Sequence, residues 1–261
     1  MRLSNVLAVY AKPTNKEQKS TLEIVNNTLK MYSASYKLID RDKLSKKLFE
    51  GSDLVVAVGG DGTFLRAAQF VGSQLLLGVN ADVKNKEGFF MKYNKNDFKI
   101  KLKNLLKNKF EIMKLPRLEA HINNKKIDAL AVNEFFIGPR KSYHAAKCVL
   151  RMGGKSERQK SSGVLVTTPA GSYAWAKACC SKTMPLKSKS YQFVVREPYE
   201  GNVYKNYKLK QGILKKNQKI EVVSEMLDGI MIADSVGMEY SLKNGSKASI
   251  SLSKKYLNVI W

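Results

Sequence analysis

Short apolar runs alternate with segments of helical spacing along the first hundred residues. The runs at residues 5–10 and 54–58 are rich in Val and Leu and predict buried strands. Leu22, Val25 and Leu29 recur at helical spacing, and Pro13-Thr14-Asn15 precedes them as a start signal, which predicts a helix over 15–31. The same reasoning predicts strands at 36–39 and 75–79 and helices at 41–49, 63–70 and 96–109. Such alternation is typical of a parallel sheet covered on both faces.

The pattern changes after about residue 110, where helical spacing persists only around 172–180. Turn residues such as Asn123-Asn124 separate short strand-like segments. These predicted strands are 118–122, 130–137, 148–152, 164–167, 191–195 and 219–223. We therefore expect an α/β N-terminal domain with a parallel sheet (1–109) plus a mostly β C-terminal domain (110–240). The tail from about 241 to 261 is expected to return to the first domain.

The composition is globular but strongly basic. Hydrophobic residues make up 44% of the chain, and 46 Lys and Arg against 22 Asp and Glu give a net charge of +24. Such a charge attracts polyanions. Because the basic residues are spread along the chain without a long basic tail, a solvated lysine-rich surface is favoured over a dedicated nucleic-acid face. A non-catalytic nucleic-acid binder is kept as an alternative of a different class.

Cysteine and histidine usage indicates neither disulfides nor a structural metal. The cysteines are Cys148, Cys179 and Cys180, an odd number of which two are adjacent, and His121 and His144 are the only histidines. A reducing, cytoplasmic compartment fits this usage best. The apolar run at residues 6–9 is too short to span a membrane and lacks a signal-peptide pattern, so no membrane association is expected.

The sharpest local feature is the sequence Gly59-Gly60-Asp61-Gly62-Thr63, called the glycine loop below. An apolar strand leads into it and a helix leaves it, so backbone N–H groups and a helix N-terminus are available to a phosphate. It matches neither the Walker pattern nor G-x-G-x-x-G. An acid here is costly unless it has a task, such as activating a hydroxyl or holding Mg²⁺. The structural alternative is a tight turn in which Asp61 caps the helix.

Three further segments carry weaker signals. Asn133-Glu134 at a strand end offers polar groups to a sugar or an amide, although an exposed strand residue explains it as well. Residues 159–163 lead to the turn at 168–175, where Ser172 is expected to cap a helix. Asp228-Gly229 is explained by a simple hairpin. No Ser-His-Asp, Cys-His or metal-ligand set is present, so hydrolytic and metalloenzyme functions are poorly supported.

In their order along the chain, these four motifs together resemble the NAD kinase family. The resemblance spans most of the chain and is nearest to the mitochondrial-type branch and its short microbial relatives, because Gly78 to Asp82 and Glu87-Gly88-Phe89 look like the longer loop of that branch. The common Thr-Pro-Thr-Gly-Ser-Thr-Ala-Tyr motif has Ala170, Tyr173 and Trp175 at its variable places. An acid common before the preceding glycine is Ser162 here.

The resemblance implies transfer of the ATP γ-phosphoryl group to the 2′-hydroxyl of the adenosine ribose of NAD. It implies that Asp61 accepts the hydroxyl proton, with Mg²⁺ neutralising charge and no protein metal ligand assigned. It also implies a homo-oligomer, a dimer or a tetramer. A lipid or diacylglycerol-type kinase with a related loop is the nearest alternative, and NAD against NADH and ATP against polyphosphate stay open. The implied nucleotide contacts are Gly59, Gly60, Gly62, Thr63, Arg66, Phe89, Asn133, Glu134, Lys160, Ser162, Ala170, Tyr173, Ala174 and Trp175.

Overall fold

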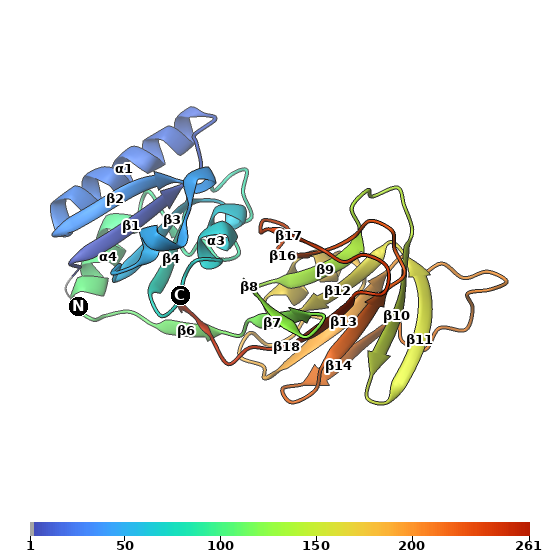
Figure 1. Ribbon diagram of the computed structural model, residues 1–261. Helices are drawn as coiled ribbons and strands as arrows, with labels where there is room; N and C mark the ends of the chain where they lie inside the picture. Colours follow the sequence, from blue (N-terminus) through green and yellow to red (C-terminus); the bar gives the residue numbers. More distant parts are fainter. Residues whose placement is uncertain (1–2) are drawn as a thin grey trace. The chain divides into compact units, whose positions relative to one another are not determined.

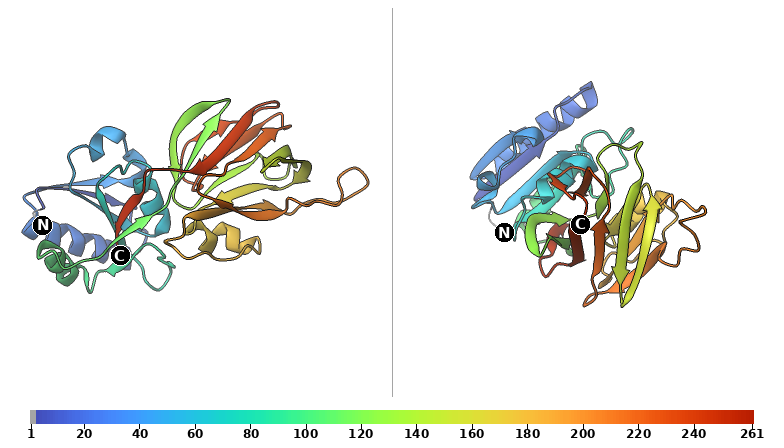
Figure 2. Two further views of the ribbon diagram at one scale, coloured as in Figure 1. Left: turned by 90° about the horizontal axis from the view of Figure 1, so that it is seen from below. Right: turned by 45° about the vertical axis from the view of Figure 1, so that its right-hand side comes forward.

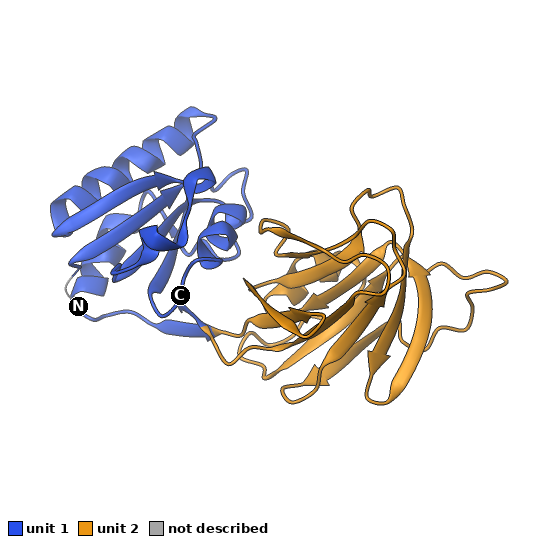
Figure 3. Ribbon diagram, viewed as in Figure 1, with its two compact units in different colours: residues 1–114, 257–261 blue, residues 115–256 orange. Residues whose placement is uncertain are grey.

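The structure is a computed structural model that describes residues 3–261 and divides into two compact units (Figure 3). Unit 1 runs to Lys114 and includes the returning segment Leu257–Trp261, and unit 2 is Leu115–Tyr256. The returning segment is shorter than the predicted tail from about residue 241. The reason is that β18 (Lys247–Leu252) pairs with β7 (Leu118–Ile122) and β15 (Ile220–Ser224), both of which lie in unit 2.

Unit 1 is built on one mainly parallel sheet (Figure 1). Its strand order is β2-β1-β3-β4-β19-β6, with β5 paired to β4, and the pairs β1–β2, β1–β3, β3–β4 and β4–β19 are parallel. This arrangement explains the continuous apolar runs, because a strand that is covered on both faces of the sheet carries apolar side chains on both. The strands are β1 (Asn5–Tyr10), β2 (Ser35–Asp40), β3 (Leu54–Gly59), β4 (Leu75–Asn80), β5 (Tyr93–Asn94), β6 (Ile112–Leu115) and β19 (Leu257–Ile260).

Helices cover the sheet of unit 1. Two of them, α1 and α4, lie side by side (Figure 2) and pack Val25, Leu29 and Phe98 into one apolar cluster with alternate residues of β1, β3 and β4. Asn15 caps α1, as its side chain accepts a hydrogen bond from Gln18 N. The helices are α1 (Lys16–Tyr32), the 3₁₀ turn η1 (Arg41–Lys43), α2 (Lys46–Phe49), α3 (Asp61–Ala68) and α4 (Phe98–Leu106). The predicted helix over 41–49 is thus split in two, and Asp40 caps only its first turn.

Unit 2 consists of two antiparallel sheets with the orders β11-β10-β15-β18-β7-β8 and β14-β13-β12-β9-β16-β17. A short 3₁₀ turn, η2 (Gly171–Tyr173), and the helix α5 (Trp175–Ala178) follow β12. The remaining strands are β8 (Lys125–Ala131), β9 (Glu134–Pro139), β10 (Ala146–Met152), β11 (Lys155–Ser161), β12 (Gly163–Thr167), β13 (Ser190–Arg196), β14 (Gln211–Lys215), β16 (Gly229–Ala233) and β17 (Glu239–Ser241).

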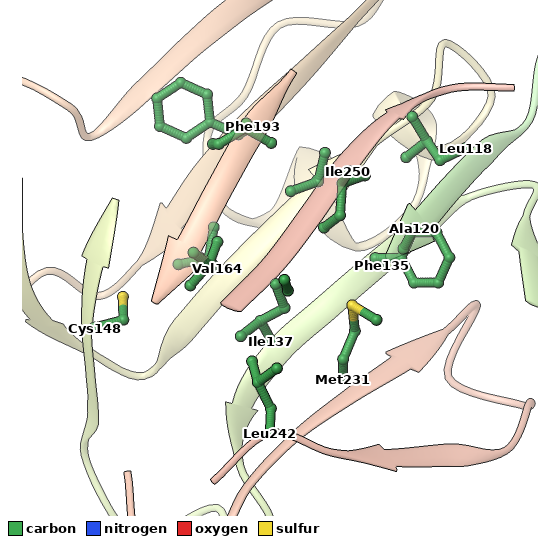
Figure 4. Packing of buried hydrophobic residues seen from close by; sticks show 14 of the residues in the cluster. Leu118, Ala120, Phe135, Ile137, Cys148, Val164, Phe193, Met231, Leu242 and Ile250 are labelled. Atoms are coloured by element: carbon green, nitrogen blue, oxygen red, sulfur yellow. The ribbon is translucent and has the colours of Figure 1, made fainter. Parts of the chain in front are cut away.

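The inward residues of both sheets of unit 2 form one apolar core (Figure 4). Leu118 and Ile250 from the first sheet and Phe135, Val164 and Phe193 from the second are all at most 1% exposed. Burial of these side chains is the main favourable contribution to folding of this unit. The unit therefore holds its loops on a well-packed scaffold.

Two sequence expectations are corrected in unit 2. The predicted strand 130–137 is two strands, because β8 and β9 belong to different sheets and Val132-Asn133 turns between them. The predicted hairpin at Asp228-Gly229 is wrong for a similar reason, since β15 pairs with β10 and β18 whereas β16 pairs with β9 and β17. Across residues 3–261, no helix is long and apolar enough to span a membrane.

Candidate functional site

The glycine loop follows β3 at the point where the strand order of unit 1 reverses. From β1 the chain moves to β2 at one edge of the sheet. It then returns to β3 on the other side of β1 and continues to β4 in that direction, so the order reverses between β1 and β3. Open α/β sheets bind ligands at the carboxyl ends of strands at such a reversal. The segment that follows β1 and the glycine loop at the end of β3 therefore lie at the edge of the sheet where a ligand is expected.

Asp61 is the first residue of α3, and Gly60 is its N-cap without a side-chain cap hydrogen bond. The alternative in which Asp61 caps this helix is therefore wrong. The first N–H groups of a helix have no intrahelical partner and carry the positive end of its dipole. This end of α3 is thus suited to an anion.

The three glycines of the loop differ in what surrounds them, and none of them has a positive φ. A Cβ on Gly59 would lie 2.4 Å from Thr63 Oγ1, and one on Gly60 would lie 3.1 Å from Lys86 Cδ. A Cβ on Gly62 would have no heavy atom within 4 Å. Gly59 is therefore required by the packing of the turn, whereas Gly62 borders open space in the first turn of α3.

The carboxylate of Asp61 is held by the segment of residues 81–92, the 81–92 loop, which connects β4 to β5. Phe89 N donates to Oδ2 at 3.0 Å, and Phe90 N donates to Oδ1 at 2.8 Å. Hydrogen bonds from backbone amides to a carboxylate are strong, and they fix the direction of the carboxylate. Asp61 is therefore oriented by a segment almost thirty positions further along the chain.

Two glycines allow the 81–92 loop to approach. A Cβ on Gly78 in β4 would lie 2.6 Å from Phe90 O, and Gly88 has φ +69°, where a Cβ would also lie 2.4 Å from Asn80 Nδ2. The left-handed region and the close contact both favour glycine. These residues are the sequence signal for the position of Phe89 and Phe90.

The start of the same loop is anchored by Asp82, which is only 2% exposed. Its Oδ2 accepts hydrogen bonds from Asn15 Nδ2 at 2.9 Å and from Asn85 Nδ2 at 3.1 Å. The hydrogen bond from Asn15, and next that from Asn85, lower the pKa of Asp82. Because Asn15 also caps α1, Asp82 ties the loop to the segment that follows β1.

Basic side chains surround the glycine loop, and most of them were not singled out from the sequence. Arg66, expected to reach a phosphate, has its Nη1 3.4 Å from Asp42 Oδ1. Arg41 Nη1 donates to Thr63 Oγ1 at 3.3 Å, and the stem of Lys86 covers Gly60. The signal for Arg41 was its position directly after the parallel strand β2, and that for Lys86 was its place in the loop that follows β4.

A second cluster of polar groups lies in unit 2, around the turn between β8 and β9. The carboxylate of Asp234 accepts hydrogen bonds from the backbone N–H groups of Val132, Asn133 and Glu134, at 3.0, 2.6 and 3.2 Å. Asp234 is 3% exposed and has φ +55°. Sequence reasoning missed it, because it follows a strand a hundred positions later and belongs to no motif.

Asn133 and Glu134 are buried yet leave polar atoms without a partner. Asn133 Oδ1 and Glu134 Oε2 accept no hydrogen bond from the described residues. Burial, and next the charge of Asp234, raise the pKa of Glu134 to about 8. At neutral pH this carboxyl is therefore mostly protonated, and it can donate a hydrogen bond where an ordinary glutamate could only accept one.

The turn at Thr168-Pro169-Ala170-Gly171-Ser172 packs directly on Asn133. Thr168 N donates to Asn133 O at 2.8 Å, and a Cβ on Gly171 would lie 2.1 Å from that oxygen. Ser172 does not cap a helix as expected, because its Oγ donates to Pro169 O and accepts from Met184 N. The structure thus brings Asn133, Glu134 and the buried Ala170 together.

The other predicted residues of unit 2 lie in two separate groups. Trp175 stacks on Phe136 at 5.2 Å, and the Arg196 guanidinium lies 4.5 Å from its ring, while Ser162 N donates to Arg196 O. Tyr173 is exposed and Ala174 is the N-cap of α5. Arg196 links Trp175 to Ser162, and no motif of the sequence pointed to this arginine.

The second group is formed by Lys160, whose Nζ lies 4.3 Å from the ring centroid of Tyr199.

A protein-bound metal centre finds no support in the ligand-type side chains. Within residues 3–261, no group of three or more His, Cys, Asp or Glu is placed to hold a metal ion. Both oxygens of Asp61 already accept backbone hydrogen bonds.

Comparison with known proteins gives consistent matches. Residues 3–110 match the family model described as the ATP-NAD kinase N-terminal domain. The whole chain aligns with 86% of a probable NADH kinase of Oryza sativa subsp. japonica at 25% identity. The fold resembles the crystal structure of an NAD kinase from Archaeoglobus fulgidus in complex with ATP, with a TM-score of 0.79 and 22% identity over 98% of this chain and 93% of that one. It also resembles that of yeast NADH kinase complexed with NADH, with a TM-score of 0.82 and 16% identity over 99% and 83%.

Proposed function

We propose that this chain is a member of the NAD kinase family and that it transfers the γ-phosphoryl group of ATP to the 2′-hydroxyl of the adenosine ribose of NAD, giving NADP and ADP. The observation that carries the assignment of the reacting centre is the setting of Asp61. At the N-terminus of α3, next to the open space at Gly62, its carboxylate is fixed by the backbone amides of Phe89 and Phe90 from the 81–92 loop. The lipid-kinase and nucleic-acid-binding alternatives are less favoured, because the comparisons match NAD and NADH kinases.

Asp61 is proposed as the general base. Its carboxylate can accept the proton of the ribose hydroxyl as the oxygen attacks phosphorus. The two amide hydrogen bonds hold the carboxylate in one direction, which places its free lone pairs reproducibly. Phosphoryl transfer depends mainly on positioning and electrostatic stabilisation, and this arrangement supplies the first.

The donor phosphates are assigned to the first turn of α3 and the backbone of Gly59, Gly60, Gly62 and Thr63. Helix N-terminal N–H groups stabilise phosphate oxygens, and the absence of a side chain at Gly62 lets them approach. Arg66 and Arg41 lie beside this turn as further positive charges. Mg²⁺ is proposed as an ion carried by the nucleotide, where it would neutralise phosphate charge.

The dinucleotide contacts of unit 2 are assigned to Asn133, Glu134 and the turn around Ala170. Their unpartnered buried atoms, Asn133 Oδ1 and Glu134 Oε2, are polar groups that a ribose or an amide can satisfy. Ser162, Tyr173, Ala174 and Trp175 are proposed as more peripheral contacts. Lys160 is proposed only as a charge that attracts the anionic substrate, since its ammonium lies on Tyr199.

The experiment is a donor and acceptor panel with the purified protein. We expect NADP from NAD with ATP and Mg²⁺, and NADH and polyphosphate are the alternative acceptor and donor to compare. Formation of no NADP or NADPH under any pairing would refute the assignment. A diacylglycerol acceptor and a DNA-binding assay test the two earlier alternatives. A homo-oligomeric state and a cytoplasmic location stay predictions, to be checked by light scattering and by fractionation.

A further inference from the structure

Lys92 ends the same loop that holds Asp61, and its ammonium lies against aromatic rings. Its Nζ is 4.0 Å from the ring centroid of Trp261 and 5.5 Å from that of Phe89. The two rings meet edge to face at 6.1 Å. Phe89 is also the residue whose backbone N–H binds Asp61, so the lysine and the carboxylate share one support.

The position of Lys92 is fixed by a chain of packed rings. Phe64 of α3 stacks on Phe90 at 4.7 Å, and Phe90 packs edge to face on Phe89 at 4.9 Å. The backbone oxygen of Lys92 also accepts a hydrogen bond from Lys101 Nζ at 2.8 Å. Both ends of the arrangement are therefore tied to the helices α3 and α4.

The ammonium of Lys92 is held by aromatic rings and forms no ion pair with an acidic side chain of the described residues. Neighbouring lysines pair with acids, Lys95 with Glu17 and Lys101 with Asp97, each at 2.7 Å. In the part of the chain that the structure describes, no such ion pair involves Lys92. A cation–π contact orients an ammonium but leaves its formal charge available. Burial lowers the pKa of Lys92, and the negative charge of Asp61 offsets part of that effect.

We propose that Lys92 is a phosphate-binding residue of this site, which contacts phosphoryl oxygens of the nucleotide donor beside Asp61 and which Trp261 and Phe89 hold in position. The proposal rests on the proposed function. The negative charge of Asp61 repels an incoming triphosphate. Lys92 supplies a fixed positive charge near Asp61 that offsets this repulsion. The aromatic support keeps this cation near Asp61 without using up its charge.

The test measures donor binding apart from turnover. The Kd of a non-hydrolysable ATP analogue with Mg²⁺ is measured by calorimetry for the wild type, Lys92→Met and Lys92→Arg. We expect Lys92→Met to weaken binding about 10- to 100-fold, the range of a lost charged hydrogen bond, and Lys92→Arg to restore most of it. The control is Lys99→Met, at an exposed position of α4, which should bind as the wild type does.

A second variant separates phosphate binding from support of the loop. Trp261→Leu keeps the ammonium but removes one ring, and we expect a smaller loss, about 3- to 10-fold. NAD binding without donor should be unchanged in Lys92→Met, and so should its thermal unfolding. Unchanged analogue binding in Lys92→Met, or an equal loss of NAD binding, would overturn the proposal. If the wild type binds the analogue through Lys92 but makes no NADP, the proposed function fails and the assignment of Lys92 stands.

Discussion

Asp61 Oδ1 lies 2.8 Å from the backbone nitrogen of Phe90. With the 3.0 Å hydrogen bond from Phe89 N to Oδ2, this contact joins the end of β3 to the 81–92 loop after β4. It explains how an acid inside a phosphate-binding turn is kept in one orientation. Asp53 in unit 1 also accepts two backbone hydrogen bonds, so a substitution at Asp53 can serve as the control for one at Asp61.

Replacing Asp61 by Asn should lower turnover about 10²- to 10⁴-fold, because the amide cannot take the hydroxyl proton. Rates of NADP formation at saturating substrates measure the effect. Asp53→Asn is the matched control, since Asp53 Oδ2 also accepts two backbone hydrogen bonds, from Ser4 and Asn5, at 2.9 Å. Full turnover in Asp61→Asn would show that this residue is not the base.

Gly62→Ala should leave folding intact and raise the KM for ATP about tenfold or more, because the new methyl group enters the open space beside α3 that is assigned to the donor phosphates. Gly59→Ala should behave differently, since its Cβ would meet Thr63 Oγ1 at 2.4 Å and force the turn to shift. Thermal unfolding and steady-state kinetics of the two variants distinguish these effects. Wild-type kinetics in Gly62→Ala would place the phosphates elsewhere.

Glu134 should make stability depend on pH. Because burial, with a contribution from Asp234, raises the pKa of Glu134 from 4.5 to about 8, the folded state holds its proton more tightly than the unfolded state. This contribution is complete below the unfolded pKa and is lost as pH rises through about 8, at up to about 1.4 kcal/mol per pH unit. Glu134→Gln should therefore lose less stability than the wild type between about pH 6 and about pH 9.

Denaturant unfolding at several pH values measures this difference. Glu50→Gln, at an exposed position in unit 1, provides the control and should follow the wild type. Parallel stability curves for wild type and Glu134→Gln would mean that Glu134 is ionised in the folded protein. In that case Glu134 could only accept a hydrogen bond from the ligand and could not donate one.

Gly171→Ala should destabilise unit 2 by about 1–3 kcal/mol, because its Cβ would lie 2.1 Å from Asn133 O and would force the turn at 168–172 away. Thermal unfolding measures the loss. Gly62→Ala, where no heavy atom lies within 4 Å of the added Cβ, is the control for adding a methyl group. Equal melting temperatures for Gly171→Ala and the wild type would show that the turn can yield.

The sequence by itself predicted the strands β1 to β4 and the main helices of unit 1, the β character of unit 2 and the resemblance to the NAD kinase family. Val- and Leu-rich runs, helical spacing and the order of four motifs are local properties, and each is written in consecutive residues. The boundaries that failed, such as the strand over 130–137 and the hairpin at Asp228-Gly229, depend on which sheet each strand joins. That choice is made by packing and not by the residues of the turn.

Only the tertiary structure decided the surroundings of the reacting groups. Phe89 and Phe90 reach Asp61, Asp234 reaches the amides of 132–134, and Trp261 reaches Lys92 across separations that no periodicity encodes. The physical reason is that a buried N–H or carboxylate must find a partner wherever the fold provides one. The sequence identified Asp61 as the acid with a task, and the fold determined how it is held.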